Sequence, residues 1–226
     1  MNAFHRSFVT ACIAASSLPA LAVGVQIQIN GVVDYNVIGG SLAGTPSGSP
    51  VAMSFLVDSN VFVDSASFPT RGYTIDLASF VMTVDGNPIN MDDPQPGGDA
   101  YFVLRDNDPA IDGFFITQGG VDLPFPTSVH IPGLAPSHDL DFLYTFANGT
   151  TLSSLNIVDA YGTYAPPNVS VYQWTLGRFG NPGAEFIPGS ITIAAVPEPA
   201  SLVLMGLGGL VVLARVRRRA GSARVV

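Results

Sequence analysis

The chain has 226 residues, 47% of them hydrophobic, a formal net charge of −8 and a single cysteine, Cys12. Six of its nine arginines lie near the two ends, so residues 23–195 hold three arginines, no lysine and sixteen acidic residues, a formal charge of −13. That charge repels phosphates and argues against a DNA or RNA partner, and one cysteine allows no disulfide within the chain.

The N-terminus has the pattern of a secretory signal. A positively charged start precedes an apolar run at residues 8–18, which is too short to span a bilayer. Ala20 and Ala22 then supply the small-x-small pattern that signal peptidase cleaves. We therefore expect residues 1–22 to be a signal peptide and the mature chain to begin near Val23.

Residues 23–195 are expected to form one domain built from β-strands. Apolar and polar residues alternate with period two in several short runs, which is typical of strands with one buried face. Gly/Pro/Asn/Asp turns separate these runs, and no convincing amphipathic helix interrupts them. The predicted strands are 25–29, 32–38, 51–57, 73–77, 79–84, 101–105, 114–117, 139–146, 155–159, 169–176 and 190–194. This series predicts an antiparallel β-sandwich, with a jelly roll as the favoured variant.

An acidic loop is the first candidate site. Asp106, Asp108 and Asp112 lie within one Asp/Asn/Gly-rich segment, and their carboxylates could supply oxygen ligands to Ca²⁺. The spacing is not that of an EF-hand, because Ala110 stands at the third ligand position and no glutamate closes the loop. The alternative is ordinary turn chemistry, in which Asp and Asn bond their own backbone. Calcium is the one cofactor that the sequence suggests.

A second candidate combines His130 and His138 with Asp139 and Asp141. Imidazoles and carboxylates can form a metal site, although proline and glycine separate the two histidines. Strand alternation places Asp139 and Asp141 on one face, which allows a carboxylate pair. Surface loop histidines are the alternative.

A third candidate is a group of aromatic residues in the last third of the domain, Tyr161, Tyr164, Tyr172 and Trp174. Exposed aromatic rings stack on sugar faces, whereas large aromatic residues at strand positions also fill cores. Tyr172 and Trp174 share a face under alternation, which suits either interpretation.

Motifs for catalysis are missing from the sequence. It has no Gly-x-Ser-x-Gly elbow, phosphate-binding loop, His-Glu-x-x-His or dinucleotide fingerprint. Sixteen carboxylates leave a glycosidase-type pair open, but a large domain without a recognisable catalytic motif favours a protein that is not an enzyme.

The C-terminal segment, residues 196–226, carries the strongest pattern in the chain. Pro197, Glu198 and Pro199 form a rigid extended motif. An uncharged apolar run at 200–214 follows, which predicts a short transmembrane helix. A basic tail at 215–226 ends the chain and should stay cytoplasmic. The arginines that directly follow the apolar run and would stop transfer are Arg215, Arg217, Arg218 and Arg219.

Together, the signal peptide, the acidic domain, the Pro-Glu-Pro motif, the apolar run and the arginines resemble the PEP-CTERM class of exported bacterial proteins. The resemblance implies that an exosortase, a membrane-embedded cysteine protease, cuts at or near Pro197–Pro199. It also implies an inner-membrane intermediate, later surface display or secretion, and an association with extracellular polysaccharide and biofilm matrix in Gram-negative bacteria. Such sorting motifs accompany many unrelated domains, so this one predicts destination rather than activity.

Two hypotheses for the function remain. The first is a structural or adhesive protein of the extracellular matrix, with signal peptidase, exosortase and the inner membrane as processing partners. The alternative is a carbohydrate-binding β-sandwich, calcium-dependent if the acidic loop holds the ion. An enzyme acting on polysaccharide is the least favoured.

Overall fold

The computed structural model describes residues 24–108, 111–166, 169–178 and 181–196. Within these ranges, antiparallel strands account for most of the chain, and two single-turn 3₁₀-helices, η1 and η2, lie in the connections. In chain order, the elements are β1 Gly24–Asn36, η1 Gly40–Leu42, β2 Pro50–Asp64, β3 Thr70–Val84, β4 Asn87–Met91, β5 Ala100–Arg105, β6 Gly113–Gln118, β7 Thr127–His130, β8 His138–Phe146, η2 Ile157–Ala160, β9 Gly162–Tyr164, β10 Val169–Arg178 and β11 Asn181–Ala195.

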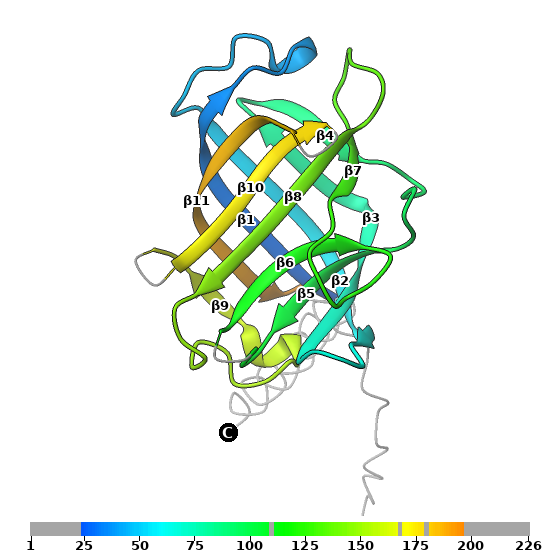
Figure 1. Cartoon of the computed structure of the whole chain (residues 1–226), viewed down its shortest axis with the longest axis vertical. Coiled ribbons are helices and arrows are strands. Elements are labelled where there is room, and N and C mark those ends of the chain that lie inside the picture. The colour runs from blue at the N-terminus through cyan, green and yellow to red at the C-terminus, as the bar shows by residue number, and fades with distance from the viewer. Residues whose placement is uncertain (1–23, 109–110, 167–168, 179–180, 197–226) are drawn as a thin grey trace, which may run out of the picture.

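The sheet closes on itself into an eight-stranded barrel (Figure 1). Hydrogen-bonded pairing runs from β10 through β11, β1 and β2 to β3. At one end of the barrel, β3 pairs with β5, β5 pairs with β6, and β6 pairs with β8. Since the other edge of β8 pairs with β10, the circle is complete.

The wall between β3 and β8 has two parts, because both of these strands change partner along their length. Val84 and its neighbours at the end of β3 pair with β4, which pairs with β7, and β7 pairs with the start of β8. The β5–β6 hairpin therefore closes one end of the wall, and the β4–β7 pair closes the other (Figure 1).

The predicted β-sandwich, with its jelly-roll variant, is therefore wrong, although the all-β class is right. A sandwich consists of two separate sheets packed face to face, whereas here one ladder of hydrogen bonds runs around the molecule. Alternation predicts which face of a strand is buried. Because a sandwich and a barrel give the same alternating pattern, alternation does not distinguish the two architectures. The ladders have register shifts, for example between Asn30 and Gly31 and between Ser54 and Leu56, and irregularities of this kind bend strands and increase their twist.

Most predicted strands lie inside observed strands, with one exception and three omissions. Residues 155–159 form no strand, because η2 begins at Ile157 and turns the chain there. The short strands β4, β7 and β9 were not predicted. The predicted turn after Val84 is confirmed at Asp85 and Gly86, which have φ angles of 52° and 80°.

Side chains fill the barrel interior, so it is a packed core. Aromatic rings form a chain of contacts across it: Phe55 to Phe102 at 5.6 Å, Phe102 to Phe114 at 5.6 Å, and Phe114 to Phe146 at 5.7 Å between centroids. Leu42 from η1 and Ile157 from η2 are buried at opposite ends. Each of the two 3₁₀-helices therefore covers one end of the core.

The two ends of the described chain meet at one end of the barrel. Val25 lies opposite Ala195, and the Val196 N–H donates to the Gly24 carbonyl at 2.7 Å. At the other end of β1, Asn36 lies opposite Ala184. The end of β10, the start of β11 and the loop between β7 and β8 therefore lie at the barrel end that is far from the termini (Figure 1).

Within the described residues, no helix is long and apolar enough to cross a membrane. The predicted transmembrane helix at 200–214, the basic tail at 215–226 and the signal peptide at 1–22 lie outside those residues. They remain predictions from the sequence.

Candidate functional site

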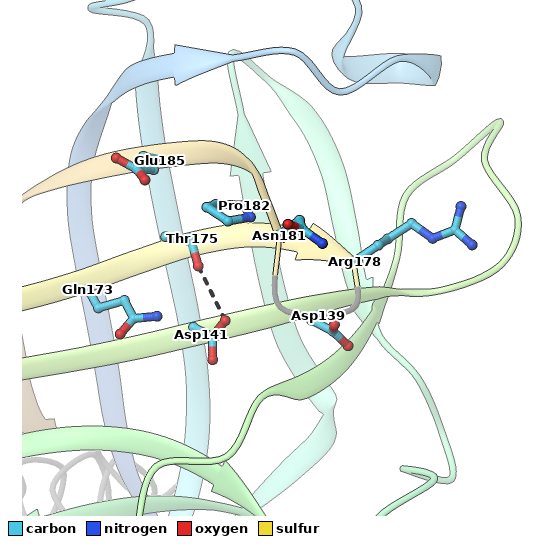
Figure 2. Close-up of a pocket in the computed structure, with 9 residues that line it drawn as sticks. Asp139, Asp141, Gln173, Thr175, Arg178, Asn181, Pro182 and Glu185 are labelled. Carbon is cyan, nitrogen blue, oxygen red and sulfur yellow. Dashed lines mark hydrogen bonds between the residues drawn. The ribbon is translucent and has the colours of Figure 1, made fainter.

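A polar groove lies on the outer wall of the barrel, near the end that is far from the termini. It has a volume of about 160 Å³ and crosses β8, β10 and β11 (Figure 2). Its lining residues are Asp139, Asp141, Gln173, Thr175, Gly177, Arg178, Asn181, Pro182 and Glu185. We call it the outer groove.

The strand register builds the floor of the outer groove. Thr175 on the central strand β10 lies directly opposite both Asp141 on β8 and Glu185 on β11. Its hydroxyl donates to the Asp141 carboxylate at 3.3 Å (Figure 2). Period-two alternation along β8 directs Asp139 to the same outer face as Asp141. The predicted carboxylate pair therefore lines one groove, together with Glu185, which the sequence did not single out.

Local electrostatics raise the pKa of Asp141 above its ordinary value. Burial is the largest cause, the charge of Asp139 adds to it, and the hydrogen bond from Thr175 acts in the opposite direction. Arg178 lies at the rim, and Figure 2 shows its side chain directed away from the carboxylates of Asp141 and Glu185. The groove is thus acidic and suits ligands that donate hydrogen bonds or carry positive charge.

A larger and more apolar cavity, of about 330 Å³, lies beside the end of β10 and the start of β11. Its apolar wall includes Ile38 and Leu134, and Arg178 borders both this cavity and the outer groove. His138 lines the cavity with only 7% of its surface exposed. Burial, and next the charge of Arg178, lower the pKa of His138 below its ordinary value.

The predicted histidine–aspartate group is not brought together. His138 is buried at the start of β8, whereas Asp139 and Asp141 line the groove on the outside of the barrel. His130 is exposed at the end of β7. Across the described ranges, no group of three or more His, Cys, Asp or Glu residues is arranged to hold a metal ion.

The acidic loop predicted to bind calcium has a structural organisation of its own. The Asp112 side chain is fully buried and accepts hydrogen bonds from the backbone N–H groups of Asn107 at 3.0 Å, Thr151 at 2.6 Å and Leu152 at 2.8 Å. Burial, and next the charge of Asp112, raise the pKa of Asp106. The Asp108 backbone N–H donates a hydrogen bond to the Ile111 carbonyl. The contacts of Asn107 and Asp108 are turn chemistry, whereas the bonds from Thr151 and Leu152 to Asp112 are tertiary contacts. Calcium binding stays an untested prediction.

The aromatic group divides between the core and the surface. Trp174 is 1% exposed and packs edge-on against Phe142 and Phe186, with centroids 5.9 and 5.4 Å away. Tyr164 is partly buried and donates a hydrogen bond to the Ala160 carbonyl at 2.8 Å. Tyr161 and Tyr172 are exposed. The sequence analysis did not single out Arg178 and Glu185, because they belong to no motif and line the same groove only through the pairing of β10 with β11.

Comparison with known proteins identifies one segment of the chain. Residues 195–219 match the family model of the PEP-CTERM protein-sorting motif, which confirms the resemblance based on Pro197, Glu198 and Pro199. Neither the curated proteins nor the solved structures include a match to this chain. The match therefore concerns sorting and leaves the activity of the barrel open.

Proposed function

We propose that this chain, which carries a PEP-CTERM protein-sorting motif at residues 195–219, is an exported protein that an exosortase processes and that serves as a structural or adhesive component of the extracellular matrix. The sorting motif supports export, a membrane-anchored intermediate and exosortase as the processing partner. The proposal goes beyond sorting when it assigns a role in the matrix, with extracellular polysaccharide as the partner.

One observation carries the proposal. The last strand of the barrel, β11, ends at Ala195, where the sorting motif begins. All described strand pairs that close the barrel are formed by residues up to Ala195, which precede Pro197. A cut at Pro197–Pro199 would therefore leave the ladder between β1 and β11 complete, and the released product would be a folded barrel.

The chemistry of the domain supports a role outside the cell. A formal charge of −13 on residues 23–195 favours solubility and mutual repulsion. Closure of the barrel through β8, β10 and β11 also limits the unpaired sheet edges that promote aggregation. The expectation that the protein is not an enzyme rests on the sequence alone and stays a prediction.

The test is a change of the sorting motif in the producing cell. Replacing Pro197, Glu198 and Pro199 with alanines should leave the protein in the inner-membrane fraction, because the exosortase would no longer recognise it. The matched control replaces Thr45, Pro46 and Ser47, a mostly exposed loop triplet, with alanines, and should be processed normally. Release of the motif variant at the normal rate would contradict the sorting assignment.

Carbohydrate binding is the second candidate, and it has a specific observation in its favour. Part of the barrel wall between β10 and β11 has no described strand pairing. The exposed Tyr172 lies there, beside the buried hydrogen-bond donors Trp174 and Tyr144.

A further inference from the structure

Strand pairing between β10 and β11 stops halfway along the barrel wall. The two strands pair only from Thr175 to Arg178, and β9 pairs with β11 only from Ile191 to Ile193. Between these ladders, no pairing is described for residues 169–174 of β10 with residues 186–190 of β11. We call this stretch the seam.

The sequence of β11 explains why the seam stays open. Pro188 has no N–H group and cannot donate to a ladder. Gly189 is an extra residue in the pairing with β1, since Ser190 lies opposite Asn30 whereas Pro188 lies opposite Gly31. The bulge bends β11 at this point, and the proline also disfavours the insertion of a peptide strand from another protein.

Tyr172 lies at the centre of the seam. It lies opposite Tyr144 on β8 and shares its side of β10 with the buried Trp174, yet it is 49% exposed. An aromatic ring that alternation directs to the core is thus accessible from outside. Tyr172 borders two depressions, one of about 120 Å³ toward Trp174 and Phe186, the other of about 180 Å³ toward Tyr144 and Ile187.

Two buried polar atoms beside the seam have no hydrogen-bond partner among the described residues: the Trp174 indole Nε1 and the Tyr144 hydroxyl. Both residues are nearly inaccessible, at 1% and 0% exposed, and they line the two depressions. Buried polar groups are nearly always satisfied in native proteins, so each of these points to an absent partner. Burial also raises the pKa of Tyr144 from the ordinary 10 to about 12, and at either value the hydroxyl is protonated at neutral pH and can donate.

The required partner has a definite chemistry. Indole N–H is a donor only, and the protonated tyrosine hydroxyl can donate, so the ligand needs acceptor oxygens. The Tyr172 ring needs a flat apolar face to stack against. Sugar rings carry both features, with C–H faces and hydroxyl or ether oxygens around the edge. Glu185 on the rim and the charge of −13 on the domain repel anionic sugars.

We propose that the seam binds a neutral glycan, which stacks on Tyr172 and accepts hydrogen bonds from Trp174 and Tyr144. The proposal specifies a class of ligand for the proposed matrix role. It depends on that role only for the location in which the protein would encounter the glycan. Glycan binding by the purified protein and processing of the tail in cells are separate measurements, so either can fail without the other.

The test is calorimetric and fluorescence titration of the mature protein with neutral oligosaccharides (maltohexaose and cellohexaose) and with anionic oligogalacturonate. Trp174 is the only tryptophan of the chain, so a change in its emission reports a ligand at the seam. We expect binding of a neutral probe with a change in emission. Tyr172→Ala and Tyr144→Phe should each weaken it by about three- to tenfold.

Tyr161→Ala, at an exposed tyrosine that lines neither depression, is the matched control and should bind as the unchanged protein does. Tyr144→Phe removes only the hydroxyl, so its packing in the core is kept, and circular dichroism verifies the fold of each variant. The proposal is overturned if no neutral probe binds, if oligogalacturonate binds in preference, or if both seam variants bind with unchanged affinity.

Discussion

At the residue scale, His138 shows how the barrel changes the chemistry of a polar side chain. It begins β8, and alternation turns its ring toward the interior, where 7% of its surface remains exposed. Transfer of an imidazole from water to such a position penalises the charged form. The positive charge of Arg178, at the rim of the same cavity, acts in the same direction.

We expect the free energy of unfolding to depend on pH through His138. Its pKa in the fold lies below the ordinary 6.5, so the neutral ring stabilises the fold. That contribution is fully present above pH 6.5 and is lost as the pH falls through the folded pKa. Denaturant titrations should therefore show the stability difference between the unchanged protein and His138→Gln shrinking below pH 6.5.

His130→Gln, at the exposed end of β7, controls for the loss of an imidazole as such. The NMR titration of His138 gives the direct readout, and a pKa at or above 6.5 would contradict this account.

The face of a strand on which a residue lies was easier to predict from the sequence than the contacts that the residue makes. The pairing of Asp139 and Asp141 on one face followed from period-two alternation, and both line the outer groove. For Asp112 the sequence suggested either a calcium ligand or turn chemistry, and its carboxylate accepts three backbone N–H groups, two of them from residues about forty positions away. Such partners are set by tertiary structure, which no local motif encodes.

At the scale of the elements, closure depends on the two strands that change partner, β3 and β8. Gly113 starts β6 and lies opposite Thr145 of β8. A Cβ atom there would lie 2.5 Å from the Tyr144 carbonyl oxygen and 3.2 Å from the Thr145 Cα. Glycine is therefore required for β6 to lie this close to β8.

Gly113→Ala should lower the free energy of unfolding by about 1–3 kcal/mol, because the new methyl group collides with the backbone of β8. The matched control is Gly120→Ala, where a Cβ atom would meet nothing within 4 Å. The control should change stability by less than about 0.5 kcal/mol. Urea denaturation measures both, and equal midpoints would show that β6 does not pair closely with β8.

Strands with a long alternating pattern were predicted well. Short strands, and the segment in which the chain turns into η2, were not. β4 and β7 have five and four residues, too few for a periodic pattern to stand out. Residues 155–159 alternate like a strand, but the chain turns there into η2, whose backbone the Tyr73 hydroxyl holds through hydrogen bonds with Leu155 and Ile157. Whether strands form a sandwich or a barrel depends on which edges meet, and alternation does not contain that information.

At the scale of the whole molecule, two of the described depressions lie away from the point where the described chain begins and ends. The termini meet at one end of the barrel, where Gly24 and Val196 are hydrogen-bonded and the sorting segment begins. The outer groove and the cavity beside His138 lie near the far end, and the seam lies in the wall between. Cleavage within Pro197–Pro199 would leave every described strand pair of the closed sheet intact.

The central claim is that this barrel is exported and cut free at its sorting motif. Intact mass spectrometry of the protein recovered from the culture medium and from membranes tests it most directly. The account predicts a released form that begins near Val23 and ends within Pro197–Pro199. A protein that keeps Arg215 to Arg219 in every fraction would contradict release and make the C-terminal segment a permanent anchor.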